Sequence, residues 1–276
     1  MKKTLACLVL VLALVATSTA AHAYHDENTP TTDGTPYTLG KNNWRIGLWK
    51  LEYGGPLSGK LQLGTWTAYW LPWAVGAHLV NFNVKYNLWS NDRWSFAAGL
   101  GLFYLDIENL VDTPVSFTVV PFDLYAAYRL SPRFTLGARL IATGLSGEGA
   151  YDRDEIDGAQ GAVAASSSQF ALSVIWRLTR VIAFESEWRV GRYVEVYGAG
   201  KATFAIDEQT EVDVFGETTA DLSDNTLSSL AARFHFSWKY VNLRLGLVLG
   251  NYTIAGINFI VPTRIPFPEL DLFVRF

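Results

Sequence analysis

One spacing in the chain suggests an enzyme, the triplet His235-Phe236-Ser237. Residues two apart in a β-strand share a face, so the imidazole of His235 would lie beside the hydroxyl of Ser237. Such a pair can work as general base and nucleophile. The sequence offers no convincing third group to orient the imidazole, which catalysis of this kind needs. We therefore expect His235 to be a structural polar side chain and no catalytic residues, and we keep hydrolysis of a lipid as a minor alternative.

Metal sites are not indicated either. His25 and His78 have no ligand neighbour at a useful spacing. The acidic stretch 148–158 fails as a calcium loop, because Ile156 stands two residues after Asp154 where a ligand is needed. We expect a solvated loop, with adventitious divalent binding as the alternative. The single Cys, Cys7, lies in the N-terminal apolar segment. We predict no metal and no cofactor.

The elements that would position these side chains are β-strands, because apolar and polar residues alternate along much of the chain. In residues 243–249 every second residue is Leu, opposite Asn242, Arg244 and Gly246. The alternation predicts strands at 44–52, 60–70, 78–89, 93–107, 115–129, 134–145, 167–178, 181–195, 228–239, 241–252 and 267–276. Barrels of single bacterial chains usually have an even number of strands. We therefore expect about 12 strands, with Pro36–Lys41 as the missing one, and 10 as the alternative.

The N-terminus predicts export. Lys2 and Lys3 precede an apolar run from Leu5 to Val15, and Ala21-His22-Ala23 is a typical cleavage site. We assign residues 1–23 to a signal peptide, 24–35 to a periplasmic lead-in and 36–276 to a barrel. The net charge of −4 argues against a nucleic-acid partner. Half of the residues are hydrophobic and 14% are aromatic, yet no later stretch approaches the ~20 apolar residues of a spanning helix. Together these features favour an all-β, antiparallel, up-and-down transmembrane barrel.

Aromatic residues beside short turns support a membrane location and give the orientation. They form an expected interfacial girdle of Trp89, Trp94, Tyr128, Trp176, Trp238 and Tyr240. The turns near 91, 131, 179 and 240 are tight, whereas the connections at 146–166, 196–227 and 251–265 are long. Short turns face the periplasm in bacterial barrels, so the long connections should face outward. Within 196–227 two alternating runs predict a projecting hairpin.

The last nine residues, from Pro268 to Phe276, alternate between apolar and mostly charged side chains. This segment resembles the closing strand of Gram-negative outer-membrane β-barrels. The resemblance implies an outer-membrane location and recognition of Phe276 by the barrel-assembly machinery. Residues 37–48 are similar to the opening of uncharacterised outer-membrane proteins of proteobacteria. The pair His235 and Ser237 resembles that of outer-membrane phospholipase A and the lipid A deacylase, but Trp238 stands where those families have Asn.

The lumen face is basic in this register. The expected inward bases are Lys85, Arg129, Arg139, Arg177, Arg189, Arg233, Lys239, Arg244 and Arg275, and the inward acids are Asp123, Glu185, Glu187, Glu269 and Asp271. His235 is also expected to line the lumen. A basic lumen favours a passive channel or facilitator for small solutes, with a mild preference for anions. The alternative is a sealed structural or surface-interaction barrel, because 12 strands lie between filled and open barrels. Expected partners are outer-membrane lipid, lipopolysaccharide and a small solute.

Two further expectations fix the register. Glu269 and Asp271 are the natural partners of Arg244 on the neighbouring strand. The side chains that should face lipid include Trp176, Phe184, Phe234 and Leu247. A slip by one residue would exchange the two faces of a strand, so each expectation tests the whole assignment.

Overall fold

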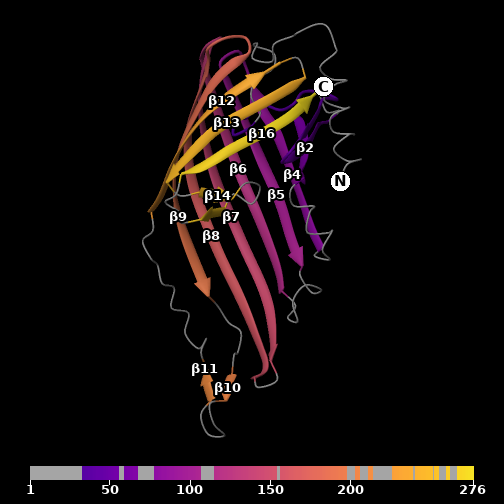
Figure 1. The fold of residues 1–276 in the computed structure, drawn as a ribbon, viewed down its shortest axis with the longest axis vertical. Coiled ribbons are helices and arrows are strands. Elements are labelled where there is room, and N and C mark those ends of the chain that lie inside the picture. Colours follow the sequence, from indigo (N-terminus) through magenta and orange to yellow (C-terminus); the bar gives the residue numbers. More distant parts are fainter. Residues whose placement is uncertain are drawn as a thin grey trace.

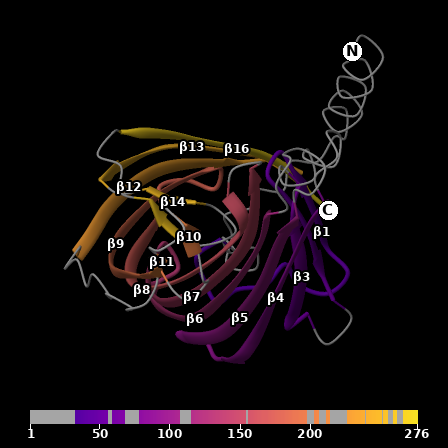
Figure 2. The same cartoon turned by 90° about the horizontal axis from the view of Figure 1, so that it is seen from below.

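The computed structural model of the protein is a closed antiparallel β-barrel, as the alternating runs predict (Figure 1). It describes residues 33–55, 59–67, 78–106, 115–153, 156–197, 203–205, 211–213, 226–238, 240–250, 252–254, 259–261 and 266–276. Seen along the barrel, the wall strands follow one another around a closed ring (Figure 2). The predicted His25, Lys239 and residues 1–32 lie outside the described part of the chain.

Twelve strands make the barrel wall, which confirms the expected number. They are β1 (Trp44–Gly47), β2 (Lys50–Gly54), β3 (Leu61–Trp66), β4 (His78–Ser90), β5 (Trp94–Asp106), β6 (Val115–Ser131), β7 (Phe134–Arg153), β8 (Ile156–Arg177), β9 (Ile182–Tyr197), β12 (Thr226–Ser237), β13 (Val241–Gly250) and β16 (Phe267–Arg275). Consecutive wall strands are hydrogen-bonded neighbours, and β1 pairs with β16 to close the ring. At this seam the amides of Trp44 and Phe276 each donate to the other residue's carbonyl, at 2.7 and 3.0 Å.

The twelfth strand is not where we expected it. Residues 36–41 form no strand, and the predicted strand 44–52 is instead divided into β1 and β2 by a turn at Leu48 and Trp49. The physical cause is a break in the alternation. Leu48 and Trp49 are consecutive and both exposed on the outer face, so the chain reverses direction and Glu52 returns inward opposite Arg45.

The long connections contain more strand than the sequence predicts. β7 and β8 continue their ladder through residues 146–166, as far as the pair Arg153 and Ile156. The apolar alternation is lost in these residues, although their backbone pairing continues. Alternation marks a strand only where its two faces meet different media. The predicted hairpin within 196–227 is confirmed as β10 (Thr203–Ala205) and β11 (Glu211–Asp213), which lie beyond the wall strands in Figure 1. A second short hairpin, β14 (Tyr252–Ile254) and β15 (Phe259–Val261), occupies part of the long connection at 251–265.

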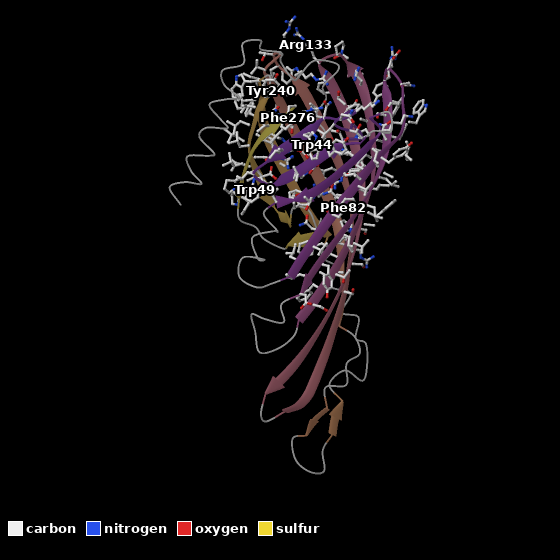
Figure 3. The ribbon with its side chains drawn as sticks, turned by 90° about the vertical axis from the view of Figure 1, so that its right-hand side faces the viewer. Trp44, Trp49, Phe82, Arg133, Tyr240 and Phe276 are labelled. Atoms are coloured by element: carbon white, nitrogen blue, oxygen red, sulfur yellow. The ribbon has the colours of Figure 1, made fainter. Side chains whose placement is uncertain are left out.

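The outer face of the barrel is apolar around its circumference. Trp176, Phe234 and Leu247 are exposed on it as expected, and half-buried Phe184 lies against Phe234 at 5.4 Å between ring centroids. Figure 3 shows outer-face side chains, with Trp44, Trp49 and Phe82 labelled. A water-soluble protein rarely exposes contiguous apolar area of this extent, whereas a membrane barrel must. The fold is therefore a transmembrane β-barrel.

No helix in the described ranges is long and apolar enough to cross a membrane.

The expected girdle aromatics lie near the short turns. Trp89, Trp94, Trp176 and Trp238 are exposed on the outer face, and Tyr128 and Tyr240 are half-buried there. Trp94 and Tyr128 contact each other with ring centroids 4.6 Å apart. Tyr240 and Phe276 lie close to the end of the barrel that carries Arg133 (Figure 3).

The first three wall strands are short, so the barrel wall has its smallest height there. β1, β2 and β3 have four, five and six residues, against 13 in β4. Pairing between β3 and β4 runs from Leu61 to Gly64 and stops there. Beyond this point the Asn81 side chain accepts from the amide of Trp66 and donates to its carbonyl. Side-chain hydrogen bonds thus replace the ladder at the edge of the low wall.

Candidate functional site in the barrel lumen

A cavity of about 580 Å³ occupies the middle of the lumen. Inward side chains of nearly every wall strand line it, and the charged ones are Lys50, Lys85, Arg139, Arg189, Arg233, Arg244, Asp33, Glu52, Asp123, Glu185, Glu187, Glu269 and Asp271. Six bases thus face seven acids. The basic excess predicted for the lumen face does not hold for the cavity wall. The inward bases Arg129, Arg177 and Arg275 lie outside this wall, and the acids Asp33 and Glu52, which were not expected in the lumen, belong to it.

Residues 33–41, which we call the lumen segment, lie inside the short-turn half of the barrel. The side chain of Leu39 is 1% exposed, and Thr35 is also buried. The amide of Leu39 donates to Gln62 Oε1 at 3.0 Å, and Asn87 Nδ2 donates to the carbonyl of Pro36 at 3.1 Å. The segment predicted to be a wall strand and its lead-in therefore fills part of the barrel interior.

Backbone packing against β2 explains how the lumen segment fits. A Cβ built on Gly54 would lie 1.7 Å from the carbonyl oxygen of Gly40, which no side chain can accommodate. Gly40 itself has φ of +81°, in the left-handed region that favours glycine. The two glycines thus let the lumen segment approach the wall directly.

Asp33, at the start of the lumen segment, contacts cations from three wall strands. Its Oδ2 accepts from Arg45 Nη1 of β1 and from Arg244 Nη1 of β13, both at 2.8 Å. Its Oδ1 accepts from Lys50 Nζ of β2 at 2.7 Å. Burial alone would raise the pKa of Asp33, but the attraction of Arg45, Lys50 and Arg244 holds that pKa well below its usual range. Asp33 is therefore an anion in the structure.

Arg45 is the most buried cation of this group, at 1% exposed. Besides Asp33 it contacts Glu52 Oε2 at 3.1 Å and Asp271 Oδ2 at 2.6 Å. Its guanidinium carbon also lies 3.8 Å from the centroid of the Phe273 ring. Arg244 lies opposite Asp271 in the register of β13 and β16, as expected for neighbouring strands. The ion pairs are nevertheless different from the expected ones: Arg45 contacts Asp271, and Arg244 contacts Asp33 and Glu185.

The other inward charges pair along and between strands. Arg139 contacts Asp123 at 2.7 Å, and Arg189 contacts Glu187 at 2.6 Å. Arg233 Nη2 donates to Glu269 Oε1 at 3.1 Å. Lys85 is buried, and its Nζ contacts the carbonyl of Thr35 at 3.4 Å. Every described residue of the predicted lumen set points into the barrel, but Arg129, Arg177, His235 and Arg275 lie outside the cavity wall.

The structure supplies the third group that the sequence lacked for His235. Glu185 Oε1 lies 3.2 Å from His235 Nδ1, and Asn242 Oδ1 lies 3.2 Å from His235 Nε2. The hydroxyl of Ser237, however, donates to Asn242 Oδ1 at 2.6 Å, and Ser237 is 0% exposed. Its proton is thus directed at an amide oxygen rather than the imidazole, in a site closed to a lipid substrate. The cluster is better explained as packing of the lumen near the short turns.

Packing of the lumen changes along its axis. Ser95, Ser237 and Asn242 near the short turns are almost completely buried, whereas the side chain of Glu269 is 30% exposed. Within the described residues, no group of three or more His, Cys, Asp or Glu is arranged to hold a metal. The arrangement is a charged cavity whose floor, toward the short turns, is made by the lumen segment and tightly packed polar side chains.

The sequence did not predict Asp33, Lys50, Glu52 or Gln62 as part of this site. Glu52 and Lys50 were hidden by the unrecognised turn, although the consecutive apolar pair Leu48 and Trp49 was a usable signal. Nothing in the local pattern marks Asp33, because its partners come from β1, β2 and β13.

The fold and its lumen define a transmembrane β-barrel with a charged internal cavity. No protein-family model matches the sequence, and no curated protein matches it either. Among solved structures, the fold is similar to a NanC porin in a rhombohedral crystal form. The two chains are 10% identical, the TM-score is 0.38, and the match covers 84% of this chain and 97% of the other. A likeness this distant does not bear on function.

Proposed function

We propose that the protein is a porin-like channel of the outer membrane that passes small solutes through its lumen. The observation that carries this proposal is that the lumen segment forms part of the cavity floor. The cavity of about 580 Å³ borders the lumen segment, which is not a wall strand. A barrel with a purely structural interior needs side chains from its own strands to fill it. Here the lumen segment, which is separate from the wall strands, fills part of the interior. Its movement would open a path for a solute.

Location and partners belong to the same proposal. The export signal in residues 1–23, the apolar outer face and the aromatic side chains near the short turns support insertion into the outer membrane of a Gram-negative bacterium. Lipid and lipopolysaccharide would surround the wall, and the barrel-assembly machinery would recognise the closing strand. Replacement of Phe276 by Ala should then reduce the amount of folded barrel in cell membranes, whereas the purified variant should still refold in detergent. Equal amounts in cells would contradict recognition through this residue.

The test of transport is conductance across planar bilayers. The wild-type chain should conduct weakly or in rare steps, and a chain that lacks residues 24–40 should conduct steadily at the same salt concentration. Circular dichroism and heat-modifiable gel mobility would verify that both chains form barrels. Absence of single-channel steps from both folded proteins would refute the channel.

The sealed barrel is the second candidate, and one observation favours it. Inward residues of the wall strands, such as Arg139 with Asp123 and Arg233 with Glu269, pair within the lumen independently of the lumen segment. If these pairs close the lumen, then removal of residues 24–40 will leave conductance unchanged at zero. The deletion therefore separates the two candidates directly.

A further inference from the structure

Three cations that belong to the barrel wall converge on one carboxylate that does not. Arg45, Lys50 and Arg244 project from β1, β2 and β13, and all contact Asp33 within 2.8 Å. The two oxygens are used differently: one accepts from Lys50, and the other accepts from both guanidinium groups. Charge-assisted hydrogen bonds of this kind are among the stronger ones in proteins. The wall thus presents a cationic site that is complementary in shape and charge to a carboxylate.

The cations are held in place without help from Asp33. Arg45 keeps Glu52, Asp271 and the ring of Phe273, and Arg244 keeps Glu185 at 2.5 Å. The Nζ of Lys50 lies 4.3 Å from the centroid of the Trp66 ring. Loss of Asp33 would therefore leave the cations close to their present positions. A site that needs no rearrangement binds its ligand more tightly than a mobile one.

The cavity gives a solute access to this site. Asp33, Lys50 and Arg244 all line the cavity of about 580 Å³, which is larger than a small organic acid requires. Among the described residues, Asp33 supplies the only carboxylate that forms an ion pair with Lys50. If the lumen segment withdraws, Lys50 is left without an anion unless one arrives from the cavity.

We infer that Arg45, Lys50 and Arg244 form a binding site for the carboxylate of a small organic acid, and that Asp33 occupies this site in the present structure. A solute carboxylate and Asp33 compete for the same three cations. Binding of the solute therefore favours release of the lumen segment from the wall. This inference rests on the proposed function, because it names the class of solute that the lumen would take up.

The test is equilibrium binding of acetate, measured by isothermal titration or by line broadening of ¹³C-labelled acetate, on the full chain in detergent. Asp33→Ala vacates the site and should bind acetate at least tenfold more tightly than the wild type. Asp33→Asn removes the charge but keeps the volume of the side chain, so its gain in affinity should be smaller than that of Asp33→Ala. Glu269→Ala removes a carboxylate of the same cavity but frees a single cation, Arg233, so it should also resemble the wild type.

A second substitution in the Asp33→Ala chain locates the binding. Adding Arg244→Gln should return the affinity for acetate to the wild-type level. Equal affinity of all these proteins, or equal gains from Asp33→Ala and Glu269→Ala, would overturn the inference. Asp33→Gly provides a second vacant site should the Ala variant fold poorly. Acetate binding does not require conduction, so a sealed barrel that binds acetate would refute the channel and leave the carboxylate site standing.

Discussion

Replacement of Asp33 by Ala should release the lumen segment while leaving the barrel intact. Removal of one partner from a buried ion pair costs about 3–5 kcal/mol. The side chain of Asp33 is 15% exposed, which places the loss at the lower end, about 3 kcal/mol. Because about 1.4 kcal/mol corresponds to a factor of ten, the open population of the segment should rise roughly a hundredfold.

Amide hydrogen exchange measures this opening. The amide of Leu39 is buried and bonded to the side chain of Gln62, so it exchanges when the lumen segment leaves the wall. Peptides that cover residues 33–43 should exchange roughly a hundredfold faster in Asp33→Ala, and peptides from β5 to β9 should not change. Glu269→Ala breaks an ion pair elsewhere in the lumen and is the matched control. Unchanged exchange at residues 33–43, or faster exchange throughout the barrel, would refute the assignment of Asp33 as the anchor of the segment.

Three other predictions concern pH, the membrane face and the glycine contact. The pKa of Asp33 is depressed in the folded state, so the stability that Asp33 gives to the docked lumen segment is fully present above its unfolded pKa of about 4. This stability is lost as the pH falls through the lower, folded pKa. Amide exchange at residues 33–43, normalised for its intrinsic pH dependence, should therefore stay level from about pH 7 to 5 and rise only in strong acid. Leu247→Arg should lower the free energy of unfolding in bilayers by about 2–4 kcal/mol if Leu247 lies near the midplane. The control Leu130→Arg, beside a short turn, should lower it by at most about 1 kcal/mol. Equal losses would contradict the register. Gly54→Ala should weaken binding of the lumen segment by about 1–3 kcal/mol, measured by the same exchange, and an unaltered rate would show that the backbones are not in contact.

The wall of the barrel was predictable because a membrane acts on each strand separately. Lipid on one side and a polar lumen on the other impose a period of two, and this period is visible in residues 243–249 without knowledge of any partner. The same logic explains the two main errors. The continuation of β7 and β8 through 146–166 has no such period in the sequence, so a loop is predicted there. At Leu48 and Trp49 the two-residue turn between β1 and β2 was mistaken for continuous strand.

The candidate site was less predictable because its contacts join distant parts of the chain. Arg45 and Asp271 are 226 residues apart, and Asp33 and Arg244 are 211 apart. Alternation shows that Arg244 points inward but does not specify which of several acids it meets. The lumen segment is polar and irregular, so it resembles an exposed leader unless its burial is known. Its role depends on a cavity that exists only after the ring has closed.

Selectivity for a solute should therefore depend less on the total charge of the cavity wall than on the contact of Asp33 with its three cations, which a solute can replace. The cavity wall has nearly equal numbers of bases and acids, so a long-range field would favour neither sign of solute. Most of its carboxylates belong to wall strands and cannot leave their partners without disrupting the barrel. Asp33 belongs to the lumen segment, which is not part of any wall strand. A free carboxylate can therefore replace Asp33 and pair with the same cations without disrupting the barrel. A neutral or cationic solute cannot, because the half-buried Lys50 would remain without a counter-charge. Preference for an anion then follows from the exchange itself, and it would persist even though the charges of the cavity wall nearly balance.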